Sequence, residues 1–323
     1  MRILIILDPL EEIKIYKDTS FTMMRAARAR GHEVCVCEQQ SLWLEGANAM
    51  VRAQPLELRE NESPWYVLGE PRAESVAAFG AVLMRKDPPF DMEYVYSTFV
   101  LERAAAQGAR VFNDPAAIRD HNEKLAITEF AQFTAPTIVT RDPLRLREFV
   151  AEHGRAVFKL LDGMGGASIF QARADDPNLS VIIETMNQFG ARSVMAQRYL
   201  PAITEGDKRV LLIGGEVVPY ALARIPKAGE ARGNLAAGGT GRAQPLSPRD
   251  REIAEALAPV LGARGLLLVG LDVIGDCLTE INVTSPTCFR EIMDQTGHDV
   301  AGQFIEALER AVESPPPGPG APA

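Results

Sequence analysis

The sequence predicts an α/β protein that begins with a doubly wound parallel sheet and continues with antiparallel hairpins. Three observations support this prediction. Apolar strand patterns alternate with helix patterns over the first third of the chain, as in parallel sheets covered by helices. The 323 residues are 46% hydrophobic and 24% charged, which is enough for a sizeable core. Farther along the chain, glycines stand between two strands rather than between a strand and a helix.

Local signals mark the elements of the first part. The helix at 18–31 has a polar start and Gly31 just past its end, and Gly108 closes the helix at 92–108. Between residues 41 and 74 the signals are weak. In order, the predicted elements are a strand at 2–7, a helix at 18–31, a strand at 32–38, a strand from 81 that runs into a Pro-Pro turn, a helix at 92–108 and a strand at 109–115.

Charged side chains follow two of these strands. Asp8 comes directly after the first strand, and Arg85, Lys86 and Asp87 come after the third. Ligands bind such sheets beyond the carboxyl ends of the strands, so these residues indicate a ligand contact, although a solvated strand end would look the same. No G-x-G-x-x-G follows the first strand, which argues against a dinucleotide.

The elements after residue 115 follow from similar signals. Pro115 suits the first turn of a helix and Ser247 suits a helix cap, whereas Pro259 should kink a helix or end it early. The predicted helices lie at 115–132, 142–154, 178–190, 247–265 and 299–313. The predicted strands lie at 136–140, 156–161, 168–173 and 193–203, in a hairpin at 207–225 and in a hairpin at 266–286.

Two segments are rich in glycine. The stretch "KLLDGMGGAS" at 159–168 looks like a phosphate loop, but a Walker loop joins a strand to a helix and ends in Gly-Lys-Ser/Thr. Glycines between two strands predict a hairpin tip, which is either a lid over phosphates or an ordinary turn. The segment 226–246 has no periodicity and carries Arg232 and Arg242, so it is either a lid over an anion or a plain surface loop.

Composition excludes several functional classes. A net charge of −9 argues against nucleic-acid binding. The four histidines do not pair at ligand spacing and no G-x-S-x-G occurs, so covalent catalysis is not favoured. Cys35 and Cys37 lack the further ligands of a zinc site, and we expect reduced thiols in a cytoplasmic protein. We expect no membrane span and no signal peptide, because every apolar stretch is too short.

Carboxylates near the C-terminus suggest a metal site. Glu280 and Asn282 are two residues apart on a predicted strand and therefore share a face. A three-residue turn at 275–277 would place Asp272 opposite Glu280, whereas a two-residue turn at 275–276 would place it on the other face. The three side chains together suit Mg²⁺, and a surface strand with polar alternation is the alternative.

Cations within apolar strands indicate a bound anion. Lys159 lies in "AVFKLL", and Arg209 and Arg224 lie on the two arms of one hairpin. Such positions are costly for a charge without a partner, although a lysine at a sheet edge can also extend to solvent. Cations, glycine-rich loops and a magnesium-type cluster, without a nucleophile, suit phosphoryl transfer.

Several motifs carry a resemblance to a known family. The motifs are "MRKDPPFD" (84–91), "NEKL" (122–125), "LDGMGGASIF" (161–170), "GDKRVL" (206–211), "LARIP" (222–226), "RGNLAAGG" (232–239), "VGLDVIGD" (269–276) and "TEINVTSPT" (279–287). In this order the chain resembles the prokaryotic-type glutathione synthetases of the ATP-grasp superfamily. The first motif distinguishes that family from ATP-grasp ligases in general.

The resemblance implies an ATP-grasp fold behind an N-terminal parallel-sheet domain, and a division of the chain into parts. The implied parts are an N-terminal substrate-binding domain at 1–121, a central ATP-grasp subdomain at 122–200, a C-terminal ATP-grasp subdomain at 201–313 and a disordered tail at 314–323. It also implies that ATP phosphorylates the C-terminal carboxylate of gamma-glutamylcysteine and that glycine attacks the acyl phosphate, which gives glutathione, ADP and phosphate.

The resemblance further implies the site residues. Those for ATP are Lys124, Lys159, Gly165, Gly166, Gln197, Tyr199, Leu200 and Asp207, with Gln197, Tyr199 and Leu200 beside the adenine and Asp207 at the ribose. Those for the substrates are Arg85, Arg209, Arg224, Arg232, Ser285 and Thr287. The catalytic residues are Arg209, Arg224 and Lys159, and Asp272, Glu280 and Asn282 hold Mg²⁺, for which Mn²⁺ is an alternative.

The resemblance implies a homotetramer, and the chain departs from the family pattern at a few places. Leu160 follows Lys159 where proline is expected, Arg198 stands at a variable position, and the Pro-rich tail is extra. Two alternatives stay open. One is an ATP-grasp ligase with a different carboxylate and amine, and the other is a nucleotide-binding regulatory protein without catalysis.

Overall fold

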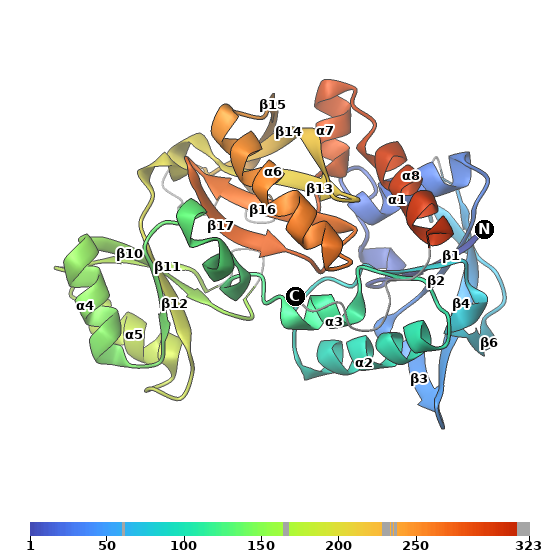
Figure 1. The fold of residues 1–323 in the computed structure, drawn as a ribbon, viewed down its shortest axis with the longest axis horizontal. Coiled ribbons are helices and arrows are strands. Elements are labelled where there is room, and N and C mark those ends of the chain that lie inside the picture. The colour runs from blue at the N-terminus through green and yellow to red at the C-terminus, as the bar shows by residue number, and fades with distance from the viewer. Residues whose placement is uncertain (60–61, 164–167, 228–232, 234, 236–237, 315–323) are drawn as a thin grey trace.

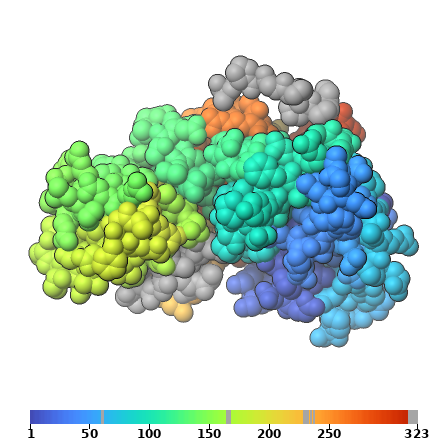
Figure 2. Space-filling model, turned by 90° about the horizontal axis from the view of Figure 1, so that it is seen from below, coloured from blue at the N-terminus to red at the C-terminus, as the bar shows by residue number. Residues whose placement is uncertain are grey.

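The residues that the structure describes form three β-sheets, each covered by helices (Figure 1). The computed structural model describes residues 1–59, 62–163, 168–227, 233, 235 and 238–314. The N-terminal and C-terminal sheets lie against each other, and the four-stranded central sheet lies at one end of the molecule. Figure 2 shows this central region, in green to yellow, as a lobe that projects from the rest. Among the described residues, no helix is long and apolar enough to cross a membrane.

The N-terminal sheet has the order β3-β4-β2-β1-β7-β8, and β5 and β6 also pair with β4. Its strands are β1 (Arg2–Ile6), β2 (Glu33–Cys37), β3 (Leu42–Glu45), β4 (Asn48–Leu58), β5 (Tyr66–Leu68), β6 (Arg72–Ser75), β7 (Ala81–Met84) and β8 (Val111–Phe112). Strands β2, β1, β7 and β8 are parallel, as predicted. Strand β4 is antiparallel to β2, so the sheet as a whole is mixed.

Helices cover both faces of the parallel part, which confirms the doubly wound arrangement. Alternate residues of β1 point to opposite faces, so Ile3 and Ile5 pack in one core and Leu4 and Ile6 in another. The first core contains residues of α1 (Thr19–Ala29) and of α8 (Val300–Glu313), which lie side by side. The second core contains residues of α2 (Met92–Ala106) and α3 (Pro115–Asp120). Helix α8, from the C-terminal part of the chain, therefore packs on the N-terminal sheet.

The central sheet is antiparallel, with the order β11-β10-β12-β9. Its strands are β9 (Thr137–Thr140), β10 (Arg155–Leu160), β11 (Phe170–Arg173) and β12 (Val194–Arg198). Helices α4 (Pro143–His153) and α5 (Leu179–Asn187) pack on it. Strands β10 and β11 pair as the two arms of the predicted glycine hairpin, and its tip at 164–167 lies outside the described residues.

The C-terminal sheet is also antiparallel and has the order β15-β14-β13-β16-β17. Its strands are β13 (Asp207–Ile213), β14 (Glu216–Ile225), β15 (Thr240–Pro245), β16 (Leu268–Ile274) and β17 (Cys277–Asn282). Val210 and Leu212 pack under α6 (Pro248–Ala263), whereas Leu211 and Ile213 join the core shared with β1. That shared core joins residues from both sides of position 121, and the predicted domain boundaries stay predictions.

Several sequence predictions were wrong in detail. Strands β3 to β6 form where only weak signals were seen, and α7 (Phe289–Thr296) was not predicted. The helix expected at 115–132 is broken into α3 and a 3-10 helix, η4 (Leu125–Phe133), which packs against the C-terminal sheet. Pro259 does not end α6 early, because the helix continues to Ala263, and the alternative of a kink stays a prediction. The short 3-10 helices are η1 (Leu10–Glu12), η2 (Gln39–Ser41), η3 (Val76–Ala78) and η5 (Pro201–Glu205).

Candidate active site

Two lysines from different parts of the fold face one carboxylate. Lys159 lies on β10 of the central sheet and Lys124 lies just before η4, yet both side chains are buried. Their Nζ atoms stand 3.5 Å and 3.7 Å from Glu280 Oε1, which β17 brings from the C-terminal sheet. Lys124 also donates to the carbonyl of Gly163 at the base of the glycine hairpin, at 2.7 Å. The predicted phosphate-binding cations therefore converge where the central and C-terminal sheets meet.

A second cluster lies on the face of the C-terminal sheet opposite α6. Arg209 donates to Asp272 from Nε at 2.5 Å and from Nη2 at 3.1 Å. Arg224 Nη2 stands 2.9 Å from Asp272 Oδ2 and 2.5 Å from Asp207 Oδ2. Both arginines and Asp272 are almost fully buried. The strand alternation explains this, because Arg209 shares its face with Leu211 rather than with Val210.

The electrostatics of this second cluster are strongly perturbed. Burial opposes ionisation of Asp272, but the guanidiniums of Arg209 and Arg224 outweigh it and hold the pKa of this carboxyl well below its usual range. Burial raises the pKa of Asp207, with repulsion from Asp272 and Glu280 adding to it and Arg224 opposing it. In this structure Asp207 contacts an arginine, and its predicted contact with the ribose stays a prediction.

The hairpin that carries the three predicted metal ligands has the shorter of the two predicted turns, yet it places Asp272 opposite Glu280 as the longer turn would. The turn between β16 and β17 has two residues, because Ile274 pairs directly with Cys277. A two-residue turn alone would put Asp272 on the wrong face, but the register shifts after Leu278 so that Asp272 pairs with Glu280. Thr279 is the extra residue, and its hydroxyl donates to the carbonyl of Asp272 at 3.1 Å.

The donor atoms of this set fit a hard divalent cation. Asn282 donates through Nδ2 to the carbonyl of Gly270 at 3.1 Å, which leaves its Oδ1 for a cation. Among the described residues no group of three His, Cys, Asp or Glu could hold a metal ion, so the predicted site depends on the amide of Asn282 as its third donor and stays a prediction. An ionised carboxylate has about four lone-pair sites, so Asp272 can accept from the arginines and still bind a cation.

The predicted adenine-binding residues lie at the end of β12, where the chain passes from the central to the C-terminal sheet. Gln197 is buried and donates to the hydroxyl of Thr137 at 3.1 Å. The guanidinium of Arg155 lies 3.7 Å from the centre of the Tyr199 ring, which fixes the position of that ring. Leu200 follows and precedes η5. No contact tests the assignment of these three residues to adenine.

Comparison with known proteins identifies the family. Residues 1–119 match the family described as prokaryotic glutathione synthetase, N-terminal domain, and residues 123–297 match prokaryotic glutathione synthetase, ATP-grasp domain. The chain belongs to the prokaryotic glutathione synthetase family. It is 66% identical over 311 residues to a glutathione synthetase of Ralstonia nicotianae, with 96% of each chain covered.

Further relatives agree with this assignment. A glutathione synthetase of Nitrosomonas europaea is 58% identical over 315 residues, covering 97% of this chain and 98% of the relative. The crystal structure of the D-cycloserine synthetase DcsG superimposes with a TM-score of 0.66 at 16% identity, covering 96% of this chain and 100% of that one. At such low identity the second likeness shows the fold alone. The prediction of an ATP-grasp fold with an N-terminal sheet domain is confirmed.

The predicted substrate residues of the N-terminal sheet lie where this sheet meets the C-terminal sheet. Arg85 is 5% exposed, and it donates to the hydroxyl of Ser20 at 3.2 Å and to the carbonyl of Pro286 at 3.0 Å. Its Nη1 is buried without a partner among the described residues, and burial lowers the pKa of its guanidinium. Ser285 donates to the carbonyl of Arg85 at 3.2 Å, whereas Thr287 is exposed.

The other predicted residues either lie away from these two clusters or fall outside the residues that the structure describes. Asp8 and Lys86 form an ion pair at 2.7 Å at the end of the parallel strands. Arg242 lies on β15 and is exposed. Gly165, Gly166 and Arg232 lie outside the described residues, as do most residues of the glycine-rich segment at 228–237.

Sequence reasoning missed two side chains beside the site. Glu123, which precedes Lys124, accepts from the hydroxyl of Thr284 at 2.8 Å, and burial raises its pKa. Asn113 follows β8 and joins the N-terminal sheet to the C-terminal one. A signal for Asn113 existed, because polar residues directly after parallel strands were used to single out Asp8 and Arg85.

Proposed function

We propose that this protein joins the cysteinyl carboxylate of gamma-L-glutamyl-L-cysteine to the amine of glycine and consumes ATP in doing so. The observation that supports this most is the convergence of two lysines and two arginines on three oxygen-bearing side chains. Lys124, Lys159, Arg209 and Arg224 are all buried. Among the described residues their ion pairs are with three carboxylates, those of Glu280, Asp272 and Asp207, so four cations leave positive charge for a further anion. The triphosphate of a nucleoside triphosphate and the phosphate of an acyl phosphate both supply negative oxygens that can pair with these cations.

The chemistry proceeds in two displacements. An oxygen of the cysteinyl carboxylate attacks the γ-phosphorus of ATP, the bond to the bridging oxygen breaks and ADP leaves, which gives an acyl phosphate. The amine of glycine then attacks the acyl carbon, phosphate leaves with the electrons of the carbon–oxygen bond, and the amine loses its extra proton. The products are glutathione, ADP and phosphate.

Each cation has a proposed task. Lys124 and Lys159 hold the phosphates of ATP, with Gly165 and Gly166 beside them. Arg209 and Arg224 neutralise charge on the transferring phosphoryl group and on the acyl phosphate, which is the main catalytic task in phosphoryl transfer. Gln197, Tyr199 and Leu200 flank the adenine, and Asp207 contacts the ribose.

ATP-grasp ligases use ATP with divalent metal ions, and we assign the metal site of this enzyme to Asp272, Glu280 and Asn282. Oxygen donors of this kind suit Mg²⁺, with Mn²⁺ as an alternative. The bound ion supplies positive charge to phosphate oxygens. Glu280 is also the counter-charge of Lys124 and Lys159.

The remaining assignments concern the substrates and the state of the protein. We assign Arg85, Arg209, Arg224, Arg232, Ser285 and Thr287 to binding of gamma-glutamylcysteine and glycine. The unpartnered Nη1 of Arg85 supports this, because a buried guanidinium N–H without an acceptor is costly unless a ligand oxygen reaches it. We also propose a cytoplasmic homotetramer that binds neither nucleic acid nor membrane.

The test is a phosphate-release assay with purified protein and ATP. We expect continuous release only when both gamma-glutamylcysteine and glycine are present, and formation of glutathione in equal amount. Release that does not depend on these two compounds would overturn the proposal. Release with another pair from a panel of carboxylates and amines would identify a ligase of different specificity.

A further inference from the structure

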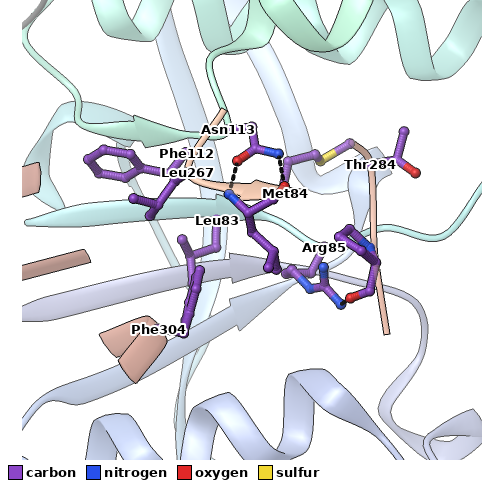
Figure 3. Close-up of a pocket in the computed structure, with 10 residues that line it drawn as sticks. Leu83, Met84, Arg85, Phe112, Asn113, Leu267, Thr284 and Phe304 are labelled. Carbon is purple, nitrogen blue, oxygen red and sulfur yellow. Dashed lines mark hydrogen bonds between the residues drawn. The ribbon is translucent and has the colours of Figure 1, made fainter. Parts of the chain in front are cut away.

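The side chain of Asn113 ties the N-terminal sheet to the strand pair that carries the metal-site residues. Asn113 directly follows β8 and is 6% exposed. Its Nδ2 donates to the carbonyls of Leu268 at 2.7 Å and Val283 at 2.8 Å. Its Oδ1 accepts from the backbone N–H of Leu268 at 2.8 Å. Figure 3 shows Asn113 above the small pocket between the two sheets, with its amide directed at β16.

Only a primary amide of this size satisfies all three backbone groups. It offers two donors on nitrogen and an acceptor on oxygen, whereas aspartate offers no donor and serine offers only one. The main chain next to Asn113 also contacts the segment before β16, because Asp114 N–H donates to the carbonyl of Gly265 at 3.0 Å. A Cβ at Gly265 would lie 2.9 Å from Asp114 Cβ, so this contact leaves no room for a side chain.

The two strands held by Asn113 carry the proposed metal ligands. Leu268 is the first residue of β16, which continues to Asp272. Val283 comes immediately after Asn282, the last residue of β17. On the other side, β8 pairs with β7, which leads into Arg85. Arg85 itself donates to the carbonyl of Pro286, three residues beyond Val283. The amide therefore links the sheet that carries the proposed substrate arginine to the strand pair that carries the proposed metal ligands.

We propose that Asn113 is a positioning residue for the ligation, an inference that rests on the proposed function. It fixes the distance between the dipeptide, which Arg85 holds on the N-terminal sheet, and the phosphoryl group, which the C-terminal sheet holds. In-line attack of the carboxylate on phosphorus requires that the dipeptide and the phosphoryl group be aligned at the correct distance. A displacement of about 1 Å at a reacting centre can cost about 10²-fold in rate.

The test compares two variants of Asn113 with a matched control. Asn113→Asp keeps the size and the acceptor, but places a charged oxygen against two carbonyls. Asn113→Ser is the milder change, because it keeps an acceptor for Leu268 N–H. Asn178→Asp is the control, since Asn178 is exposed and its side chain caps no helix N–H. The readouts are kcat and KM for each substrate, corrected for the folded fraction, and the dissociation constant of ATP.

For Asn113→Asp we expect kcat/KM for gamma-glutamylcysteine to fall by about 10²-fold, with ATP affinity unchanged. Asn113→Ser should show a smaller loss of the same kind, and Asn178→Asp none. A lower melting temperature with unchanged kinetics, a loss of ATP affinity as large as the loss of kcat, or failure of both variants to fold would each assign Asn113 to stability alone and overturn the proposal. Because wild-type turnover is measured first, its absence would refute the proposed function instead.

Discussion

Replacing Glu280 by glutamine tests the convergence of the two lysines most sharply. The substitution keeps the shape of the side chain and removes the negative charge that stands 3.5 Å from Lys159 Nζ and 3.7 Å from Lys124 Nζ. Removing one partner of a buried ion pair costs about 3–5 kcal/mol. The Glu280 side chain is 18% exposed, so water reduces the cost, and we expect a loss of about 2 kcal/mol in the free energy of unfolding.

The effect of this substitution on catalysis should be larger than its effect on folding. Loss of one preorganised electrostatic group costs about 10²–10³-fold in kcat, and Glu280 is also a proposed metal ligand. Without a divalent ion, Glu280→Gln should bind ATP at least as tightly as the wild type, because a carboxylate that repels the phosphates is gone. With the ion present, the wild type should gain affinity and the variant should not.

The assays are ATP titration with and without the divalent ion, phosphate release, and denaturation by urea. Glu216→Gln is the control, because Glu216 is an exposed glutamate at the start of β14. Unchanged turnover in Glu280→Gln would refute the assignment of this residue to the metal. Weaker binding of ATP in the absence of the ion would refute the charge argument.

Three further predictions concern binding, a helix cap and pH. Lys159→Met removes a buried cation and should weaken ATP binding by about 1.5 kcal/mol, roughly tenfold; unaltered affinity in a titration would contradict its role. Ser247→Ala removes the capping box of α6 and should lower the free energy of unfolding by about 1 kcal/mol, with kcat unchanged, as measured in urea. Hydrogen bonds from Arg30 and His32 lower the pKa of Glu309 from 4.5 to about 2, so its stabilisation is present above pH 4.5 and is lost as the pH falls toward 2. Glu309→Gln should therefore cost about 0.5 kcal/mol at neutral pH, and the cost should vanish in acid; a cost independent of pH would contradict this pairing.

Elements with local signals were predictable from the sequence. The α1 helix begins after Asp18, whose side chain accepts from Phe21 N–H, and Gly31 beyond its end has a positive φ of 80°. Both features depend on neighbouring residues alone. By contrast, β4 pairs with β2, β3, β5 and β6, and its pattern is set by those partners rather than by its own residues.

The metal site illustrates where sequence reasoning reaches its limit. The residue types of Glu280 and Asn282 and their shared face follow from spacing alone. The placement of Asp272 does not, because it depends on a register shift at Thr279 that compensates for the short turn. Nothing in the residue types around Thr279 indicates that it, rather than a neighbour, is the extra residue of the bulge.

Contacts between distant segments were equally inaccessible. The ion pairs of Asp272 with Arg209 and Arg224 join three strands. The position of Asn113 against Leu268 joins two sheets across 155 positions of the chain. These contacts follow from the packing of the sheets, and a one-dimensional pattern does not encode them.

The most direct test of the central claim follows an oxygen atom through the reaction. Gamma-glutamylcysteine labelled with heavy oxygen in its cysteinyl carboxylate is incubated with the enzyme, ATP and glycine, and the released phosphate is examined by mass spectrometry. An acyl phosphate route predicts that one labelled oxygen moves from each carboxylate to the phosphate. Unlabelled phosphate released together with glutathione would contradict the proposed chemistry and the roles given to Arg209 and Arg224.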